Sequence, residues 1–195
     1  ARNLAMASLG CVLAQNVHNQ NSVLKGANPF ESVILPDFSG CAGVKRRQEI
    51  LHESEQTVVL SDFAHHPTAI AGALESLRAR WPGREILACF EPRSNTAVTN
   101  VFEDRFADAL ALADIALLGA VHRAEKIPEG KRINPVNMIA RIEEAGKKGY
   151  FFSTNSDLES FLAERVSSQP CLVVFFSNGS FDGVIDRFAE SVKNT

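Results

Sequence analysis

The sequence predicts an α/β fold: a Rossmann-like, doubly wound and mostly parallel sheet with an N-terminal β-hairpin. After residue 45, short apolar runs alternate with segments of helical period. The helical segments are long enough for the right-handed crossovers that join parallel strands. Two short β-type runs separated by four polar residues predict the hairpin. These observations favour one α/β domain over residues 45–195.

The elements follow from local pattern. We expect the hairpin strands at Glu49–His52 and Thr57–Asp62. The period of the apolar residues predicts a helix over Thr68–Trp81, which Pro82-Gly83 ends. Buried-strand runs then predict strands at Glu85–Phe90, Ile115–Leu118, Tyr150–Phe152 and Cys171–Phe176. Between and after them, helices are predicted at Val101–Ala113 and Val136–Ala145, from Asp157, and from Phe181.

The first twenty residues have a different character. Apolar side chains such as Leu4, Leu9 and Leu13 surround much of the predicted helix, so it needs burial on more than one side. We therefore expect residues 1–44 to be a helical remnant of a larger body.

Bulk properties exclude several functions. A formal charge of −3 gives no broad cationic field for nucleic acid or an anionic membrane. No apolar run approaches the roughly 20 residues that a membrane span needs, and the N-terminus lacks a signal-peptide pattern. The four cysteines show no C-x-x-C spacing, which favours a reduced, cytoplasmic protein without a metal site.

Polar side chains follow the predicted strands. In an open α/β sheet, these segments gather at the carboxyl edge, where ligands bind. They are Ser61–Thr68, Glu91–Thr96, Gly119–Gly130 and Ser177–Ser180. The first combines Asp62, His65 and His66 with Pro67, which suits a first helical turn near an anion.

Each candidate also has a purely structural interpretation. Asp62 could cap the next helix, and the two histidines could be a packed pair. Arg93 could lie in solvent, although its fork geometry suits a carboxylate. Lys45-Arg46-Arg47 could be an exposed charge run, and Ser177-Asn178-Gly179 a tight turn. The chain has no G-x-x-x-x-G-K-[ST], G-x-G-x-x-G or G-x-S-x-G motif for phosphate, dinucleotide or hydrolase chemistry.

Taken together, the motifs resemble those of the Mur ligase superfamily, and most closely its murein peptide ligase branch. The resemblance is carried by Asp62-Phe63-Ala64-His65-His66-Pro67-Thr68-Ala69-Ile70, Glu91-Pro92-Arg93-Ser94-Asn95-Thr96, Ser177-Asn178-Gly179, Arg46-Arg47-Gln48-Glu49 and Asn3. It implies a C-terminal domain at 45–195, with residues 1–44 as the tail of a central ATP-binding domain and linker. The UDP-sugar domain, the phosphate loop and the magnesium ligands would lie outside this chain.

The resemblance also implies an activity. Such ligases use ATP and Mg²⁺ to activate UDP-N-acetylmuramate as an acyl phosphate, which an amine of the murein tripeptide L-alanyl-γ-D-glutamyl-meso-diaminopimelate attacks. This chain alone would be inactive. The implied nucleotide contacts are Asn3, Arg47, Asp62 and His66, of which His66 is the candidate catalytic residue. The implied substrate contacts are His65, Arg93, Ser94, Asn95, Thr96, Ser177 and Asn178.

Three other interpretations stay open. The chain could belong to a UDP-N-acetylmuramate–L-alanine ligase, or it could be a stand-alone nucleotide- or peptide-binding module. A folylpolyglutamate ligase is the third, against which the His65-His66 loop and the E-P-R-S-N-T segment argue.

Overall fold

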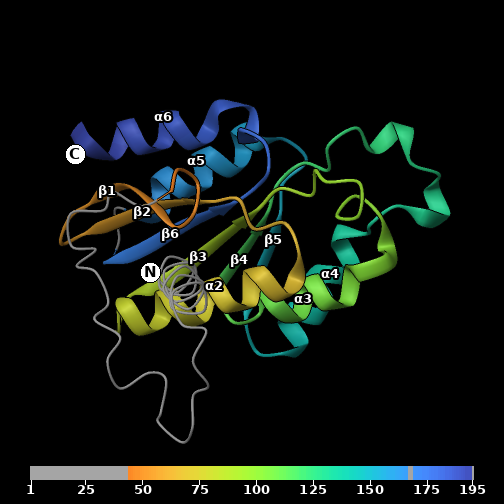
Figure 1. Cartoon of the computed structure of the whole chain (residues 1–195), viewed down its shortest axis with the longest axis horizontal. Coiled ribbons are helices and arrows are strands. Elements are labelled where there is room, and N and C mark those ends of the chain that lie inside the picture. The colour runs from red at the N-terminus through yellow and green to blue at the C-terminus, as the bar shows by residue number, and fades with distance from the viewer. Residues whose placement is uncertain (1–43, 167–168, 195) are drawn as a thin grey trace, which may run out of the picture. The chain divides into compact units, whose positions relative to one another are not determined.

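The computed structural model describes residues 44–166 and 169–194. They form a six-stranded sheet in the order β1-β2-β6-β3-β4-β5 (Figure 1). The strands are β1 (Glu49–Glu53), β2 (Thr57–Asp62), β3 (Glu85–Phe90), β4 (Ile115–Leu118), β5 (Lys148–Phe151) and β6 (Cys171–Phe176). Only the β1–β2 pair is antiparallel among these pairings, so the predicted fold class is confirmed. The helix predicted near the N-terminus, and with it Asn3, lies outside the described residues.

Helices cover both faces of the sheet, as a doubly wound fold requires. Figure 1 shows α2, α3 and α4 on one face and α5 and α6 on the other. The α-helices are α2 (Pro67–Arg80), α3 (Glu103–Leu110), α4 (Pro135–Glu144), α5 (Asn155–Val166) and α6 (Val184–Ser191). Single 3₁₀ turns occur at η1 (Asn100–Phe102), η2 (Ala124–Lys126), η3 (Glu129–Lys131), η4 (Phe181–Gly183) and η5 (Val192–Asn194). None of the helices described is both long and apolar enough to cross a membrane.

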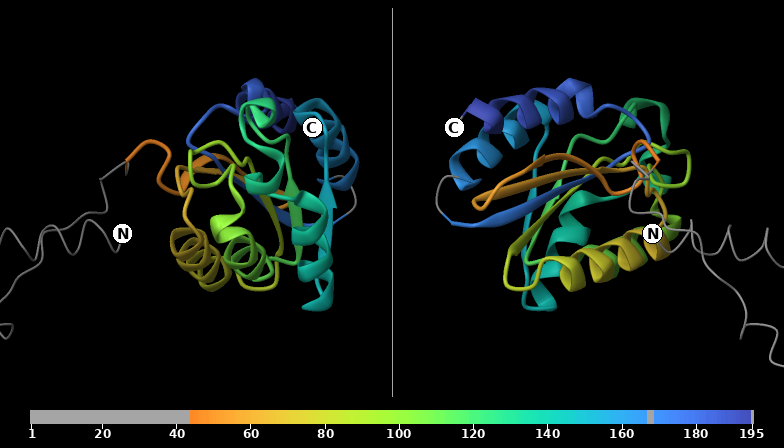
Figure 2. Two further views of the ribbon diagram at one scale, coloured as in Figure 1. Left: turned by 90° about the vertical axis from the view of Figure 1, so that its right-hand side faces the viewer. Right: turned by 60° about the vertical axis from the view of Figure 1, so that its left-hand side comes forward.

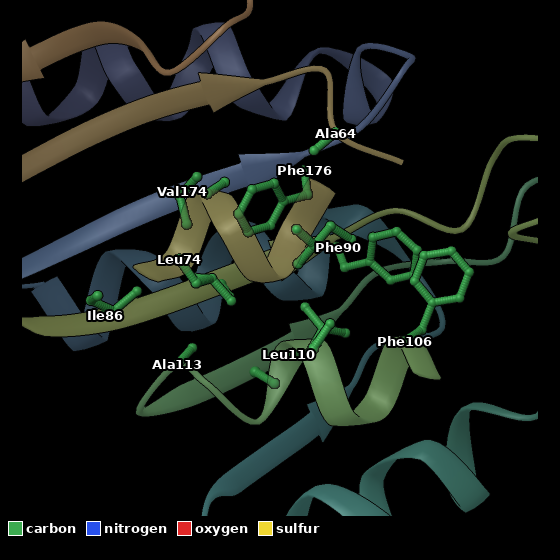
Figure 3. Packing of buried hydrophobic residues seen from close by; sticks show 14 of the residues in the cluster. Ala64, Leu74, Ile86, Phe90, Phe106, Leu110, Ala113, Val174 and Phe176 are labelled. Carbon is green, nitrogen blue, oxygen red and sulfur yellow. The ribbon is translucent and has the colours of Figure 1, made fainter. Parts of the chain in front are cut away.

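The central strands are apolar on both faces because helices bury both sides. Along β3, Ile86, Ala88 and Phe90 belong to the cluster under α2 and α3. Leu87 and Cys89 alternate with them and belong to the cluster under α5 and α6. The first cluster appears in Figure 3, where Phe90 lies against Phe106 of α3, with ring centroids 4.8 Å apart. Burial raises the pKa of the free Cys89 thiol, so this side chain serves as core.

The helix after β2 begins where the sequence predicts, but a different residue caps it. His66 has extended backbone angles, and its Nδ1 accepts a hydrogen bond from the Thr68 N–H at 3.4 Å. Pro67 occupies the first helical position, where its missing N–H costs nothing. The alternative that Asp62 caps this helix is therefore wrong.

The last helix begins later than the pattern predicts. Phe181 and Asp182 both adopt left-handed backbone angles, each with φ of 52°. These two residues, with Gly183, form the separate turn η4, and regular α-helix starts only at Val184. Hydrophobic period cannot reveal this, because it reports that Phe181 is buried, as it is here, and not the backbone angles of the residue.

Strand register brings the candidate segments together. Asp62 pairs with Phe176, and Phe176 pairs with Phe90, so β2, β6 and β3 end at one level. The residues that follow these strands therefore lie side by side in the middle of the carboxyl edge. In the right-hand view of Figure 2, the loops that follow the strands gather at one end of the sheet.

Candidate functional site

The segment before β1 reaches this edge because β1 runs antiparallel to β2. Glu49 pairs with Ser61, which sets residues 46–48 beside the end of β2. Arg46 and Gln48 have left-handed backbone angles, with φ of 57° and 50°. For residues other than glycine such angles cost about 1–3 kcal/mol each. Two such residues flank the exposed Arg47, which indicates that specific contacts hold the backbone of this segment.

Arg46 connects this segment to the loop after β6. Its Nη2 donates to the Ser177 carbonyl oxygen at 2.7 Å and to the carbonyl oxygen of Gly179. Its guanidinium carbon lies 5.2 Å from the centre of the Phe63 ring. The sequence does not reveal this role of Arg46, because its two partners lie 131 and 133 residues further along the chain.

Arg47 also lies near the Phe63 ring, but it faces solvent. Its guanidinium carbon is 5.4 Å from the Phe63 ring centre, and the side chain is exposed. An arginine in this position can reach an anion outside the domain.

Asp62 is a buried carboxylate, 5% exposed, at the end of β2. Its Oδ1 accepts from the Ala64 N–H at 2.8 Å, and its Oδ2 accepts from the Gln48 N–H at 3.2 Å. Burial raises the pKa of Asp62, although the Ala64 and Gln48 N–H groups and the Arg47 charge act to lower it. Asp62 thus joins the Gln48 segment to the histidine loop.

The two adjacent histidines present different ring nitrogens. His65 Nδ1 lies 2.8 Å from the Phe63 carbonyl oxygen, which can only accept, so Nδ1 carries the proton. His66 Nδ1 instead accepts from the Thr68 N–H, which leaves the proton of neutral His66 on Nε2. His66 is exposed, and its ring meets Phe102 edge-on at 5.3 Å. His66 can therefore donate from Nε2 to an anion.

The segment after β3 holds a partly exposed arginine over a glycine. Arg93 Nη1 lies 3.4 Å from Glu91 Oε1, and the Arg93 side chain is 30% exposed. A Cβ added at Gly179 would overlap the Arg93 Cδ, Nε and Cζ atoms. Among the described residues, Glu91 is the hydrogen-bond partner of Arg93, so most of its five N–H donors remain available.

The other predicted residues of this segment differ in their contacts. The Ser94 hydroxyl accepts from the Ala97 N–H at 3.2 Å and so shapes the turn. Asn95 and Thr96 are exposed. The Thr96 carbonyl oxygen accepts from the Thr99 hydroxyl at 2.9 Å.

The loop after β6 lies between Arg46 and Arg93. The Ser177 hydroxyl donates to Glu91 Oε2 and accepts from the Gly179 N–H at 2.7 Å. The side-chain oxygen of Asn178 is buried and accepts no hydrogen bond within the described part of the chain. Such an orphan acceptor in a folded protein is rare enough to need an explanation.

Two further features complete this edge. A cavity of about 310 Å³ opens between the start of α5 and the loop before α6; Asn155 and Asp182 are among its lining residues, and Arg93 and His66 are not. Within residues 44–166 and 169–194, no three histidine, cysteine, aspartate or glutamate side chains are grouped to hold a metal ion. The part of the chain that the structure describes therefore offers no such side-chain group for a magnesium ion.

Comparison with known families decides the assignment. Residues 46–179, more than half of the chain, match the family model of the Mur ligase glutamate ligase domain. The chain belongs to the Mur ligase family. The matched range includes Arg47, the histidine loop, Arg93 and Asn178, so the predicted segments lie inside a Mur ligase C-terminal domain.

Three relatives give the scale of the similarity. The UDP-N-acetylmuramate–L-alanine ligase of Borreliella afzelii is 25% identical over 91% of this chain, which spans 40% of that protein. The corresponding enzyme of Magnetococcus marinus is 31% identical over 67% of this chain and is covered over 28% of its length. The crystal structure of a murein peptide ligase from Psychrobacter arcticus aligns with a TM-score of 0.60 and 28% identity, over 79% of this chain and 31% of that one.

Proposed function

We propose that this chain is the amino-substrate-binding domain of an ATP-dependent ligase that joins UDP-N-acetylmuramate to L-alanyl-γ-D-glutamyl-meso-diaminopimelate in the cytoplasm. The chain spans less than half of the ligases compared above, so the remaining domains would hold the sugar nucleotide and Mg²⁺. ATP supplies the phosphoryl group that activates the muramate carboxylate. The amine of the peptide then forms the amide bond as phosphate leaves.

The observation that carries this proposal is the unused hydrogen-bonding capacity of Arg93 and Asn178. Arg93 offers free N–H groups in the fork geometry that binds carboxylates. Asn178 offers a buried acceptor without a partner among the residues described. A peptide that carries both carboxylates and N–H donors complements these two groups.

The nucleotide would meet the other end of the same edge. Arg47 and His66 are exposed, and α2 begins directly after His66, so the positive end of its helix dipole lies there. We assign the phosphates to this end, with Asp62 bracing the two loops that carry these residues. His65, Ser94, Asn95, Thr96 and Ser177 are proposed to shape or contact the amino-substrate side. Asn3 is proposed to contact adenine.

A second candidate is ligation of free L-alanine. Two of the relatives compared above are UDP-N-acetylmuramate–L-alanine ligases, and one is a murein peptide ligase. Both amino substrates carry a carboxylate that the guanidinium of Arg93 could bind. They differ in the length of the amino substrate.

The test is phosphate release by the complete protein with ATP, UDP-N-acetylmuramate and one amino substrate at a time. Release that requires the tripeptide supports the first proposal. Release that requires L-alanine replaces it with the second. Release with neither would leave a nucleotide- or peptide-binding module as the function.

A further inference from the structure

Glu91 is the most deeply buried carboxylate at the carboxyl edge, with 2% of its side chain exposed. Its backbone N–H donates to the Phe176 carbonyl oxygen at 3.1 Å, which fixes the residue against the end of β6. A buried carboxylate is stable only when its oxygens are paired. The partners of Glu91 therefore show what it organises.

Each carboxylate oxygen of Glu91 has a different partner. Oε2 accepts the Ser177 hydroxyl, which fixes the direction of that proton. The hydroxyl oxygen is then free to accept the Gly179 N–H at 2.7 Å. Oε1 lies 3.4 Å from Arg93 Nη1, a long contact that attracts the guanidinium without occupying its other N–H groups.

The two partners of Glu91 meet again at Gly179. The Arg93 side chain crosses the glycine so closely that an added Cβ would overlap it. Gly179 itself is held by the Ser177 hydroxyl and, through its carbonyl oxygen, by Arg46. Glu91 thus acts on Arg93 in two ways. Its carboxylate attracts the guanidinium, and through Ser177 it holds the Gly179 backbone against which the Arg93 side chain lies.

We propose that Glu91 is a positioning residue of the amino-substrate site, which acts through Arg93 and Ser177. It orients the guanidinium so that its free N–H groups face an incoming carboxylate. It also neutralises part of the arginine charge while no substrate is bound. This inference rests on the proposed function, because it assumes that Arg93 binds a substrate carboxylate.

The test is a double-mutant cycle on Glu91 and Arg93 in the complete ligase. Glu91→Gln keeps the size of the side chain and removes its charge. We expect it to raise the KM for the amino substrate about 10-fold, a loss of roughly 1.4 kcal/mol, and to leave the KM for ATP unchanged. In the Arg93→Ala background, the same change should alter the KM for the amino substrate less than 2-fold, since contacting residues are not additive.

Glu85→Gln is the matched control. Glu85 begins the same strand, β3, and pairs with Arg165 at 2.7 Å at the opposite end of the sheet. This variant should leave both KM values unchanged. Urea denaturation of each variant checks that the kinetic assay uses folded protein. The urea midpoints of Glu91→Gln and Glu85→Gln are compared for this purpose.

The outcomes separate the two levels of the proposal. An effect of Arg93→Ala without an effect of Glu91→Gln overturns this inference and leaves the proposed function standing. Fully additive effects mean that Glu91 does not act through Arg93, which also overturns it. An Arg93→Ala variant with unchanged KM for every amino substrate also overturns this inference, because Arg93 then binds no substrate carboxylate. The proposed function itself falls only if the complete protein releases phosphate with none of the amino substrates.

Discussion

The amino and carboxyl edges of the sheet carry the same kinds of charged residue, but these residues differ in how completely they are paired within the domain. At the amino edge, Asp114 accepts from the Ile86 N–H at 2.9 Å and contacts Arg78 at 2.7 Å and Lys147 at 3.3 Å. At the carboxyl edge, Arg93 has one long contact and Asn178 has an acceptor without a partner in the described residues. One edge satisfies its charges within the domain. The other leaves hydrogen-bonding capacity for a ligand.

The carboxylates show the same difference in their pKa values. Burial raises the pKa of Asp114, but the Ile86 N–H and the Arg78 and Lys147 cations outweigh it, so the pKa lies below 3.8. Burial of Asp62 outweighs its hydrogen bonds, and its pKa lies above 3.8. Left-handed residues also concentrate at the carboxyl edge, at Arg46, Gln48 and Asp182. The amino edge therefore stabilises the domain, whereas the carboxyl edge is shaped at some cost in stability.

The largest effect should come from removing the free arginine. Arg93→Ala should raise the KM for the amino substrate about 10- to 100-fold in the complete ligase, because a hydrogen bond to a charged group contributes roughly 1.5–3 kcal/mol. The KM for ATP should stay the same. Steady-state phosphate release measures both. Arg80→Ala is the control, since Arg80 stacks on Trp81 at 4.3 Å at the amino edge. Equal losses for both substrates would argue against a carboxylate contact at Arg93.

The next effect is on stability at the amino edge. Asp114→Asn should lower the free energy of unfolding by about 1–2 kcal/mol near pH 7, a modest figure because solvent screens partly exposed ion pairs. A lowered pKa stabilises the fold above pH 3.8, and this contribution is lost as the pH falls through the folded-state pKa. Urea unfolding at pH 7 and near pH 3 measures the difference. A loss that is the same at both pH values would contradict the ion-pair account.

Two glycines give a smaller, paired effect. Gly179→Ala should displace the Arg93 side chain and raise the KM for the amino substrate about 5-fold, or roughly 1 kcal/mol, with little change in stability. Gly83, in the turn after α2, has a φ of +82° and open space around it. Gly83→Ala should instead lower the unfolding free energy by about 1 kcal/mol with unchanged kinetics. Thermal melts measure the stability of both variants, and steady-state kinetics measure their KM values. A stability loss in Gly179→Ala with unchanged KM, or a KM change in Gly83→Ala, would contradict the difference between the two edges.

The smallest expected effect concerns Asp62 and tests whether its pKa is raised in the folded protein. Because its pKa is raised in the folded state, the wild-type protein loses stability as the pH rises from 3.8 through that pKa. Asp62→Asn removes this titration, so its unfolding free energy should rise relative to that of the wild type over the same range. The difference should stay below about 1 kcal/mol, since the amide also loses one acceptor. If the unfolding free energy of Asp62→Asn fell relative to that of the wild type as the pH rose, burial would not be raising the pKa of Asp62.

The sequence predicts the fold well because both faces of the central strands are buried. Strands β2, β3, β4 and β6 have the predicted bounds, since continuous apolar runs end where the polar loops begin. The predicted start of α6 was wrong, because the hydrophobic period of a sequence does not indicate the left-handed backbone angles of Phe181 and Asp182.

The candidate site is predicted in part. The order of strand-following loops indicates that Asp62, Arg93 and Ser177 lie at one edge, and strand register confirms their proximity. Arg46 and Glu91 were missed, because their partners are distant in sequence. A carboxylate directly after a buried strand was the available signal for Glu91. The functional roles of the individual site residues stay predictions.

The most direct test of the central claim is an NMR titration of this chain with the murein tripeptide. Backbone amide shifts locate binding even when it is weak. The account predicts that shifts concentrate at Arg93, Asn178 and Gly179, and that amides around Glu85 and Asp114 remain unchanged. Shifts concentrated at the amino edge, or none at millimolar peptide, would contradict it.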